Sequence, residues 1–443
     1  MNLDLLGGSG IMTSEMLIMN KDCVAMAADS AATLFGEKTK IYEANKVFAL
    51  SKQYPVGLMT YQSPIISGVP VETLVKEYRK YALNNREKEI GTIDKYGENF
   101  LDFIEKGYPT DDDSQILIIS EKMMETNAIR CILSLWESIM SNIGEQINDA
   151  VEKKMNCNSL EIKLSPDKMI KNILLEIESK ERTPRDLDQK YISSVKKGLD
   201  NIFKSESFKR AMNKTSNPIA AKPYLKRIKS IFQNMVLSEE PFWDTTGIVI
   251  AGFGESQIFP AFVEYNVDGC FWGKLKFKEI RSGEISDENS AMIIPFAQGD
   301  VAATFIEGID PDIKRNIIEK FRGIISDVKD IKSIGGSTPT KDVIDKAKEL
   351  ALNDFIDVLN RSTLEKSNPI IRSVKFLSKK EMGHMAESMI NLTSLRRRMS
   401  VNSDETVGGP VDVAIISKGD GLIWIKRKHY FDVALNPHYN GSE

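Results

Sequence analysis

The stretch DCVAMAADSAAT, residues 22–33, carries an acidic residue, Asp29, at the end of an apolar run. Similar short β-branched and apolar runs lie around it, at residues 14–19, 24–28, 47–50 and 56–61. Turn residues at 20–22 and 52–55 divide them into pairs. Short apolar runs bounded by turn residues are typical of strands. We therefore predict two consecutive β-hairpins near the start of the chain.

The periodicity of the apolar residues changes four times after these hairpins. From about Val71 to Gln233 apolar residues recur at intervals of three and four, which predicts helices. Strand-like runs return at residues 247–253, 258–267 and 271–277, where Gly254-Glu255-Ser256 and Asp268-Gly269 are turn signals. Helical periodicity resumes from about residue 299 to 400, before a last predicted hairpin with arms at 411–416 and 422–425.

This order of strands and helices predicts the fold class. Each sheet must cover its apolar faces, so two sheets and two helical layers satisfy the order. We expect an α/β (α+β) fold, a four-layer αββα sandwich with a large helical insertion. The predicted domains are residues 13–63 and 244–443 as two parts of one core, and 64–243 as a mainly helical insertion that starts with a core helix. A second helical insertion is expected at about 309–365.

Composition excludes several classes of protein. A formal net charge of -4 over 443 residues is not that of a nucleic-acid-binding chain. No apolar run approaches the roughly 18 residues that span a bilayer, so no membrane partner is expected and the cytoplasm is the default compartment. The four cysteines show no metal-ligand or disulfide spacing, so no metal is expected. The basic runs at 196–229 and 396–398 are expected to be solvated helix faces.

Two residues at strand ends suggest chemistry. Asp29 ends one predicted strand and Lys46 opens another, so a carboxylate and an ammonium can meet in a partly buried pocket. Asp404 precedes the Gly408-Gly409 turn, which its side chain can cap. From these residues alone, structural roles at strand ends remain open for Asp29 and Lys46.

The segment from Thr13 to Tyr61 resembles the first hairpins of proteasome β-subunits, which read Thr, a strand, a short turn, Ala-Ala-Asp and later Lys-Val. The stretch from Asp404 to Val411 resembles the Asp-x-x-Ser-Gly-Gly segment of that family, and Ala297-Gln298-Gly299-Asp300 resembles its Gly-Ser-Gly loop. The resemblance covers residues 13–61 and about 247–443. It covers neither the insertion at 64–243 nor much of 309–365.

The resemblance implies an N-terminal-nucleophile (Ntn) hydrolase. The nucleophilic threonine of the family falls on Thr13, its aspartates on Asp29 and Asp404, and its lysine on Lys46 if one residue is inserted. Tyr61, Gln298 and Gly408 fall on oxyanion and supporting positions. Tyr61 replaces a family glycine, and Gln298 and Val407 replace its two helper serines, so the sequence departs from the family pattern at these three positions. No metal or cofactor is implied.

An N-terminal threonine needs a free α-amine, because that amine is its general base. Twelve residues precede Thr13 in the sequence. We expect translation from Met12 followed by removal of that methionine; a propeptide that cleaves itself is the alternative.

The expected function is therefore a threonine-type, proteasome-like hydrolase of peptide or amide bonds, acting on peptides or proteins, cytoplasmic, and a homo-oligomer in which a ring is possible. Two alternatives remain. One is an acylase of small amides on the same fold. The other is a catalytically degenerate subunit for assembly or peptide binding, which the residues at Tyr61, Gln298 and Val407 favour.

Overall fold

The computed structural model describes residues 14–34, 40–84, 90–109, 115–156, 165–242, 245–297, 299–327, 341–399 and 409–429. The chain divides into two compact units. Unit 1 comprises Met1–Ile11 and Ala32–Gly283, and unit 2 comprises Met12–Ala31 and Glu284–Glu443. Each unit is built around its own antiparallel five-stranded sheet.

The sheet of unit 2 combines strands from three distant parts of the sequence. Its order is β14 (Ala291–Ala297), β1 (Ser14–Asn20), β2 (Val24–Asp29), β15 (Val411–Ser417) and β16 (Gly421–Lys426). Neighbouring strands are antiparallel throughout. All residues of β1, β2 and β15 are buried, so both faces of the central strands are covered.

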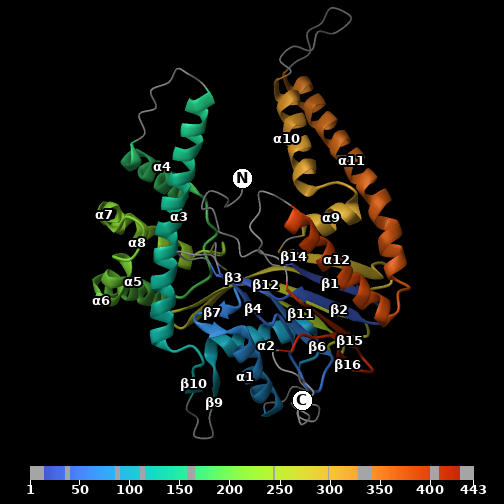
Figure 1. Cartoon of the computed structure of the whole chain (residues 1–443). Helices are drawn as coiled ribbons and strands as arrows, with labels where there is room; N and C mark the ends of the chain where they lie inside the picture. The colour runs from blue at the N-terminus through green and yellow to red at the C-terminus, as the bar shows by residue number, and fades with distance from the viewer. Residues whose placement is uncertain are drawn as a thin grey trace, which may run out of the picture. The chain divides into compact units, whose positions relative to one another are not determined.

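Four helices complete the described part of unit 2: α9 (Asp300–Glu307), α10 (Pro311–Asp327), α11 (Lys341–Val374) and α12 (Lys379–Met399). Helix α12 lies along the sheet (Figure 1), where its Met382, Ala386 and Ile390 form one core with Met16 and Ile18 of β1. The alternate residues of β1 point to this core because side chains along a strand alternate between faces.

The sheet of unit 1 has the order β13 (Lys274–Glu284), β12 (Ala261–Phe271), β11 (Thr246–Gly252), β6 (Val56–Gln62) and β5 (Val47–Ala49). Helices α1 (Val71–Asn84) and α2 (Ile93–Lys106) share one apolar core with this sheet. Aromatic side chains of the two helices make edge-to-face contacts there, with ring centroids 5.2 Å apart for Tyr78 and Phe100.

A second core of unit 1 is mainly helical. It is formed by α3 (Glu121–Asn156), α4 (Pro166–Ser179), α5 (Gln189–Lys204), α6 (Glu206–Met212), α7 (Pro218–Ala221) and α8 (Leu225–Val236), with a 3-10 turn at Lys222–Tyr224. The side chains of Asp188 and Ser205 cap α5 and α6 by accepting backbone hydrogen bonds. Arg185 ties this region to the sheet, since its Nη2 donates to the carbonyl of Leu275 at 2.9 Å.

Three short strand pairs complete the described elements: β3 (Ala31–Leu34) with β4 (Lys40–Glu43), β7 (Ile65–Ile66) with β8 (Val69–Pro70), and β9 (Tyr108–Pro109) with β10 (Gln115–Ile116). The chain is thus a mixed helix and sheet protein with antiparallel sheets, as the sequence predicts at this coarser level. The four-layer stacking and the expected domain boundaries stay predictions.

Two local predictions are wrong. Asp268-Gly269 is not a turn, because β12 continues to Phe271 and the chain reverses at Trp272-Gly273, where both φ angles are positive. The strand β14 is also missing from the sequence prediction. It contains Pro295, which counts against a strand in sequence reasoning, yet β14 is an edge strand, the position where proline is tolerated.

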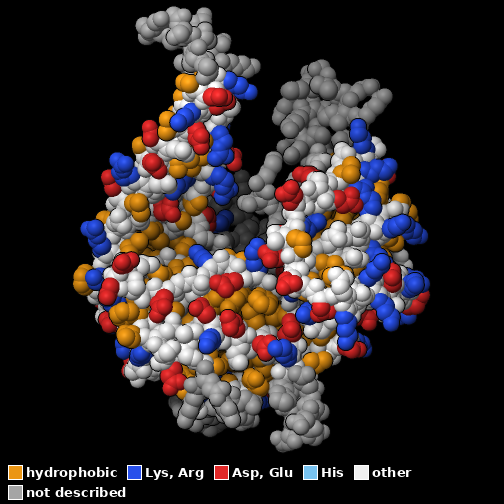
Figure 2. All heavy atoms as spheres, turned by 180° about the vertical axis from the view of Figure 1, so that it is seen from behind, with side chains coloured by type: hydrophobic (Ala, Val, Ile, Leu, Met, Phe, Trp, Pro, Cys, Tyr) orange, Lys and Arg blue, Asp and Glu red, His pale blue; other side chains and the backbone are white. Residues whose placement is uncertain are grey.

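Within the described residues, no helix combines the length and apolarity needed to cross a bilayer. On the face of the molecule shown in Figure 2, Lys and Arg side chains lie among Asp and Glu side chains and form no single basic patch.

Candidate active site

The register of the unit 2 sheet gathers four strand ends at one edge. Ser14, which starts β1, lies opposite Ala297, which ends β14, while Asp29 at the end of β2 lies opposite Val411 at the start of β15. Each of these ends adjoins a segment in which the sequence predicts a site residue. We call this edge, defined by Ser14, Asp29, Ala297 and Val411, the site edge.

Of the predicted site residues, Asp29 is described by the structure and lies at the site edge. It is buried, with 1% of its surface exposed. The backbone N–H of Ser14 donates to its Oδ1 across 3.4 Å. A buried carboxylate needs such donors, because burial removes the water that would otherwise solvate its charge. The carboxylate therefore faces the peptide group that opens β1.

Asp29 is followed by a buried serine in a polar cluster. Ser30 Oγ donates to the carbonyl of Pro410 and accepts from Lys428 Nζ at 2.8 Å. The same ammonium pairs with Asp412 Oδ2 at 3.0 Å. The sequence gives no signal for this cluster, because its members lie nearly 400 residues apart and no local motif joins them.

The site edge also holds an unfavourable backbone conformation. Ala297 has φ of 53°, in the left-handed region that side chains with a Cβ atom rarely adopt. Its carbonyl accepts the N–H of Gly299 at 3.1 Å, which closes a tight turn before α9. Strained residues of this kind concentrate at functional sites, and the strain supports the choice of this edge as a candidate site.

Lys46 lies in unit 1, directly before β5, and is buried, with 3% of its surface exposed. Its carbonyl accepts the N–H of Thr60 at 2.8 Å, which fixes its backbone to β6. A lysine this buried is unusual, since the ammonium loses its hydration. The burial of Lys46 agrees with a position in a buried site. That Lys46 and Asp29 belong to the same site stays a prediction.

Tyr61 has its side chain engaged within the sheet of unit 1. Its hydroxyl donates to Glu264 Oε1 at 2.5 Å and also lies 3.1 Å from Asn266 Oδ1. The ring crosses β11 over Gly247, where a Cβ atom would lie 2.2 Å from the ring. Glycine at 247 thus makes room for the tyrosine. The supporting role expected of Tyr61 stays a prediction.

The residue after Tyr61 was not singled out from the sequence. Gln62 has φ of 61°, a left-handed conformation that favours glycine, and its side-chain oxygen accepts from Thr245 Oγ1 at 2.8 Å. The conformation cannot be read from the amino-acid type, because glutamine shows no preference for it.

Thr13, Gln298, Asp404 and Gly408 lie outside the described residues. Their predicted roles stay predictions. Among the residues that the structure describes, no group of three or more His, Cys, Asp or Glu side chains is arranged to hold a metal ion.

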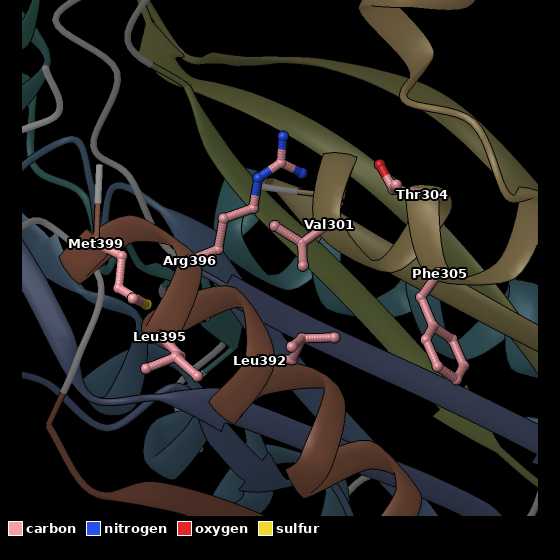
Figure 3. A pocket seen from close by; sticks show the side chains of 7 residues that line it. All are labelled: Val301, Thr304, Phe305, Leu392, Leu395, Arg396 and Met399. Carbon is pink, nitrogen blue, oxygen red and sulfur yellow. The ribbon is translucent and has the colours of Figure 1, made fainter. Parts of the chain in front are cut away.

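An open groove of about 730 Å³ lies in unit 2 between α9 and α12 (Figure 3). Helix α9 contributes Val301, Thr304 and Phe305, and helix α12 contributes Leu392, Leu395, Arg396 and Met399. Arg396 donates to Asp310 at 3.0 Å, and this bond lowers the pKa of the Asp310 carboxyl. The groove is mainly apolar, and the sequence prediction did not include it.

Comparison with known proteins establishes no family. No family model and no curated protein matches the chain. Among solved structures it is similar to Anbu (ancestral beta-subunit) from Yersinia bercovieri, with 8% identity, a TM-score of 0.25, and coverage of 96% of this chain and 92% of that one. The helical assembly of the Anbu complex from Pseudomonas aeruginosa has 7% identity, a TM-score of 0.23 and coverage of 96% and 92%.

Likenesses at these TM-scores carry no argument, so the identification of the chain as a proteasome β-subunit relative is corrected: no comparison supports it. The motifs on which it relied are short. An aspartate at the end of an apolar strand and a Gly-Gly turn before another strand occur in many hairpins, because turn chemistry alone favours them. What remains for a functional argument is the chemistry of the site edge.

Proposed function

We propose that this chain is a threonine-type hydrolase of peptide or amide bonds, in which the hydroxyl of Thr13 is the nucleophile. One observation carries the proposal. The N–H that donates to the buried Asp29 carboxylate is that of Ser14, and it therefore belongs to the peptide bond between Thr13 and Ser14. A buried carboxylate thus lies against the peptide group that carries the proposed nucleophile.

The chemistry requires Thr13 to be the first residue. The pKa of a free α-amine is ordinarily about 8. The amine of Thr13 then takes the proton of the hydroxyl while Oγ attacks the substrate carbonyl. The amine returns that proton to the leaving nitrogen as the amide bond breaks, and an ester on Thr13 remains. Water, deprotonated by the same amine, hydrolyses the ester and restores the hydroxyl. No external oxidant or cofactor enters this balance.

The other predicted residues take supporting roles in the proposal. Lys46 keeps the pKa of the amine low by like-charge repulsion, and Asp29 and Asp404 orient the charged groups by hydrogen bonds. The four-layer αββα sandwich belongs to the same proposal, as do a cytoplasmic location and a homo-oligomer. The buried state of both Asp29 and Lys46 supports it.

The decisive experiment determines the N-terminus and the nucleophile together. Protein made from the native gene with its upstream region is examined by intact mass and N-terminal sequencing, then treated with a β-lactone that acylates threonine. We expect a chain that begins at Thr13 and one acyl group per chain on that residue. Thr13→Ser retains a hydroxyl and should still be acylated, whereas Thr13→Ala should not.

A chain that begins at Met1 and resists acylation contradicts the proposal. The alternative, a subunit for peptide binding or assembly, then becomes the better hypothesis. The hydrogen bond from Tyr61 to Glu264 favours it, because a side chain held in the sheet supports packing.

A further inference from the structure

The Lys428 ammonium connects three segments that meet beside the site edge. It donates to Ser30 Oγ at 2.8 Å and pairs with Asp412 Oδ2 at 3.0 Å. The backbone N–H of Lys428 donates to the other oxygen of Asp412 at 2.8 Å. Lys428, two residues after the end of β16, is thus held by the end of β2 and by the start of β15.

These contacts fix the direction of the Ser30 hydroxyl. An ammonium can only donate, so it occupies a lone pair of Oγ. The single hydrogen of the hydroxyl is then directed to its other partner, the carbonyl of Pro410. Lys428, Ser30 and Pro410 form a chain of hydrogen bonds with one orientation.

The chain of hydrogen bonds holds the start of β15 against the end of β2. Ser30 follows Asp29, and Pro410 precedes Val411, the residue opposite Asp29. Gly409 lies beside Ser30: its φ is 81°, and a Cβ atom on it would make an ordinary contact of 3.4 Å with Ser30 Cβ. The position of the Asp29 backbone thus depends on contacts that Lys428 orients.

We propose that Lys428 is a positioning residue of the hydrolase: through Ser30 it holds the carboxylate of Asp29 and the entry of β15 in the arrangement that Thr13 needs. This inference rests on the proposed function. The side chains of Lys428 and Asp412 are 12% and 5% exposed. Their charges are therefore poorly screened by water, so the ammonium anchors the network more firmly than a surface lysine would.

The experiment compares rates of acylation by the β-lactone in four variants of the full chain. Lys428→Met removes the ammonium, and Ser30→Ala removes only the hydroxyl. Lys428→Met with Asp412→Asn removes both charges but keeps an oxygen that can accept the backbone N–H of Lys428, so no buried charge is left without its partner. Lys426→Met is the matched control, because Lys426 pairs at the surface with Glu387 and lies two residues away.

We expect Lys428→Met and Ser30→Ala to lower the maximal acylation rate by about 10- to 100-fold, the effect of a small misplacement in a reacting site, with unchanged half-saturating lactone concentration. The double variant should unfold at nearly the wild-type temperature yet acylate as slowly as Lys428→Met. Lys426→Met should match the wild type in both.

Acylation of Ser30→Ala or of the double variant within about twofold of the wild-type rate would overturn the positioning role while leaving the proposed function intact, and so would slow acylation that tracks lost thermal stability alone. A wild-type chain with Thr13 exposed that is not acylated would overturn the proposed function and this inference with it. The two failures are therefore distinguished by the wild-type protein.

Discussion

Asp268 and Lys276 form a fully buried ion pair in unit 1, with 3.1 Å between Oδ2 and Nζ and 1% of each side chain exposed. Asp268 also accepts the N–H of Phe242 at 2.9 Å, and Lys276 donates to the carbonyl of Ser238 at 2.9 Å. The pair joins the β12–β13 hairpin to the chain that follows α8. Burial raises the pKa of Asp268 to about 6, although Lys276 opposes the shift.

The first prediction follows from this pair. An acid whose folded pKa exceeds its unfolded value of about 3.9 contributes stability that is complete below pH 4 and is lost as the pH rises through 6. Lys276→Met removes the attraction that restrains this pKa, so Asp268 becomes harder to ionise. We expect a loss of about 3 kcal/mol in the free energy of unfolding at pH 8 and a smaller loss at pH 5, measured by urea unfolding.

The control for this prediction is Lys276→Met combined with Asp268→Asn, which leaves no titrating group at the site. Its stability should not fall with the ionisation of residue 268, so its loss relative to the wild type should be no larger at pH 8 than at pH 5. An equal loss at pH 5 and pH 8 in the single variant would show that the ionisation of Asp268 does not govern stability.

A second prediction concerns the contact of α5 with the β12–β13 turn. A Cβ atom on Gly198 would lie 1.7 Å from Trp272 Nε1, so Gly198→Ala forces the indole to move. We expect a loss of about 1–3 kcal/mol in the free energy of unfolding. Gly144→Ala in α3 meets nothing within 4 Å and should instead gain up to about 1 kcal/mol through helix propensity. Equal changes in both variants would contradict the close contact.

A third prediction tests strain at the site edge. Ala297 has φ of 53°, which glycine adopts more readily than alanine. The residue is exposed, so Ala297→Gly removes little packing. We expect a gain of roughly 0.5–1 kcal/mol in thermal or urea unfolding. Ala251→Gly in β11, where φ is not positive, should lose about as much. A loss in Ala297→Gly would mean that the left-handed backbone stores no strain.

A fourth prediction tests Asp29 within the proposed function. Asp29→Asn keeps the shape of the side chain and removes its charge, so the orientation of the charged groups is lost. We expect the acylation rate of Thr13 by the β-lactone to fall about 100-fold, a typical loss for a group that assists proton transfer. Asp22→Asn, in the exposed turn between β1 and β2, should leave the rate unchanged. Wild-type rates in Asp29→Asn would remove Asp29 from the mechanism.

Much of the strand pattern could be predicted from the sequence, because buried strands bounded by turns have a clear local signature. The first hairpin illustrates this: the predicted strands at 14–19 and 24–28 correspond to β1 and β2. Asp268-Gly269 shows the limit of local reasoning. Asp-Gly favours a turn, but it is compatible with a strand when the aspartate pairs with a buried ammonium. That partner, Lys276, lies in the next strand, β13, outside the few residues from which a turn is predicted.

The candidate site could be predicted only in part for the same reason. Asp29 and Lys46 carry local signals, since a charged residue at the end of an apolar strand stands out, and both are buried. The cluster of Lys428 with Ser30 carries none, because its contacts arise from the register of β2, β15 and β16. Strand register across hundreds of residues follows from packing and is not encoded in any short motif.

Pro295 has a consequence beyond its local geometry. It lies in β14, the outermost of the described strands on one side of the unit 2 sheet, and its ring nitrogen carries no hydrogen. A strand from another molecule that approached this border would lack a donor at that step of the ladder and would meet the ring. Proline in an edge strand is one of the devices that discourage pairing with a strand of another molecule, and Pro295 supplies it at this border.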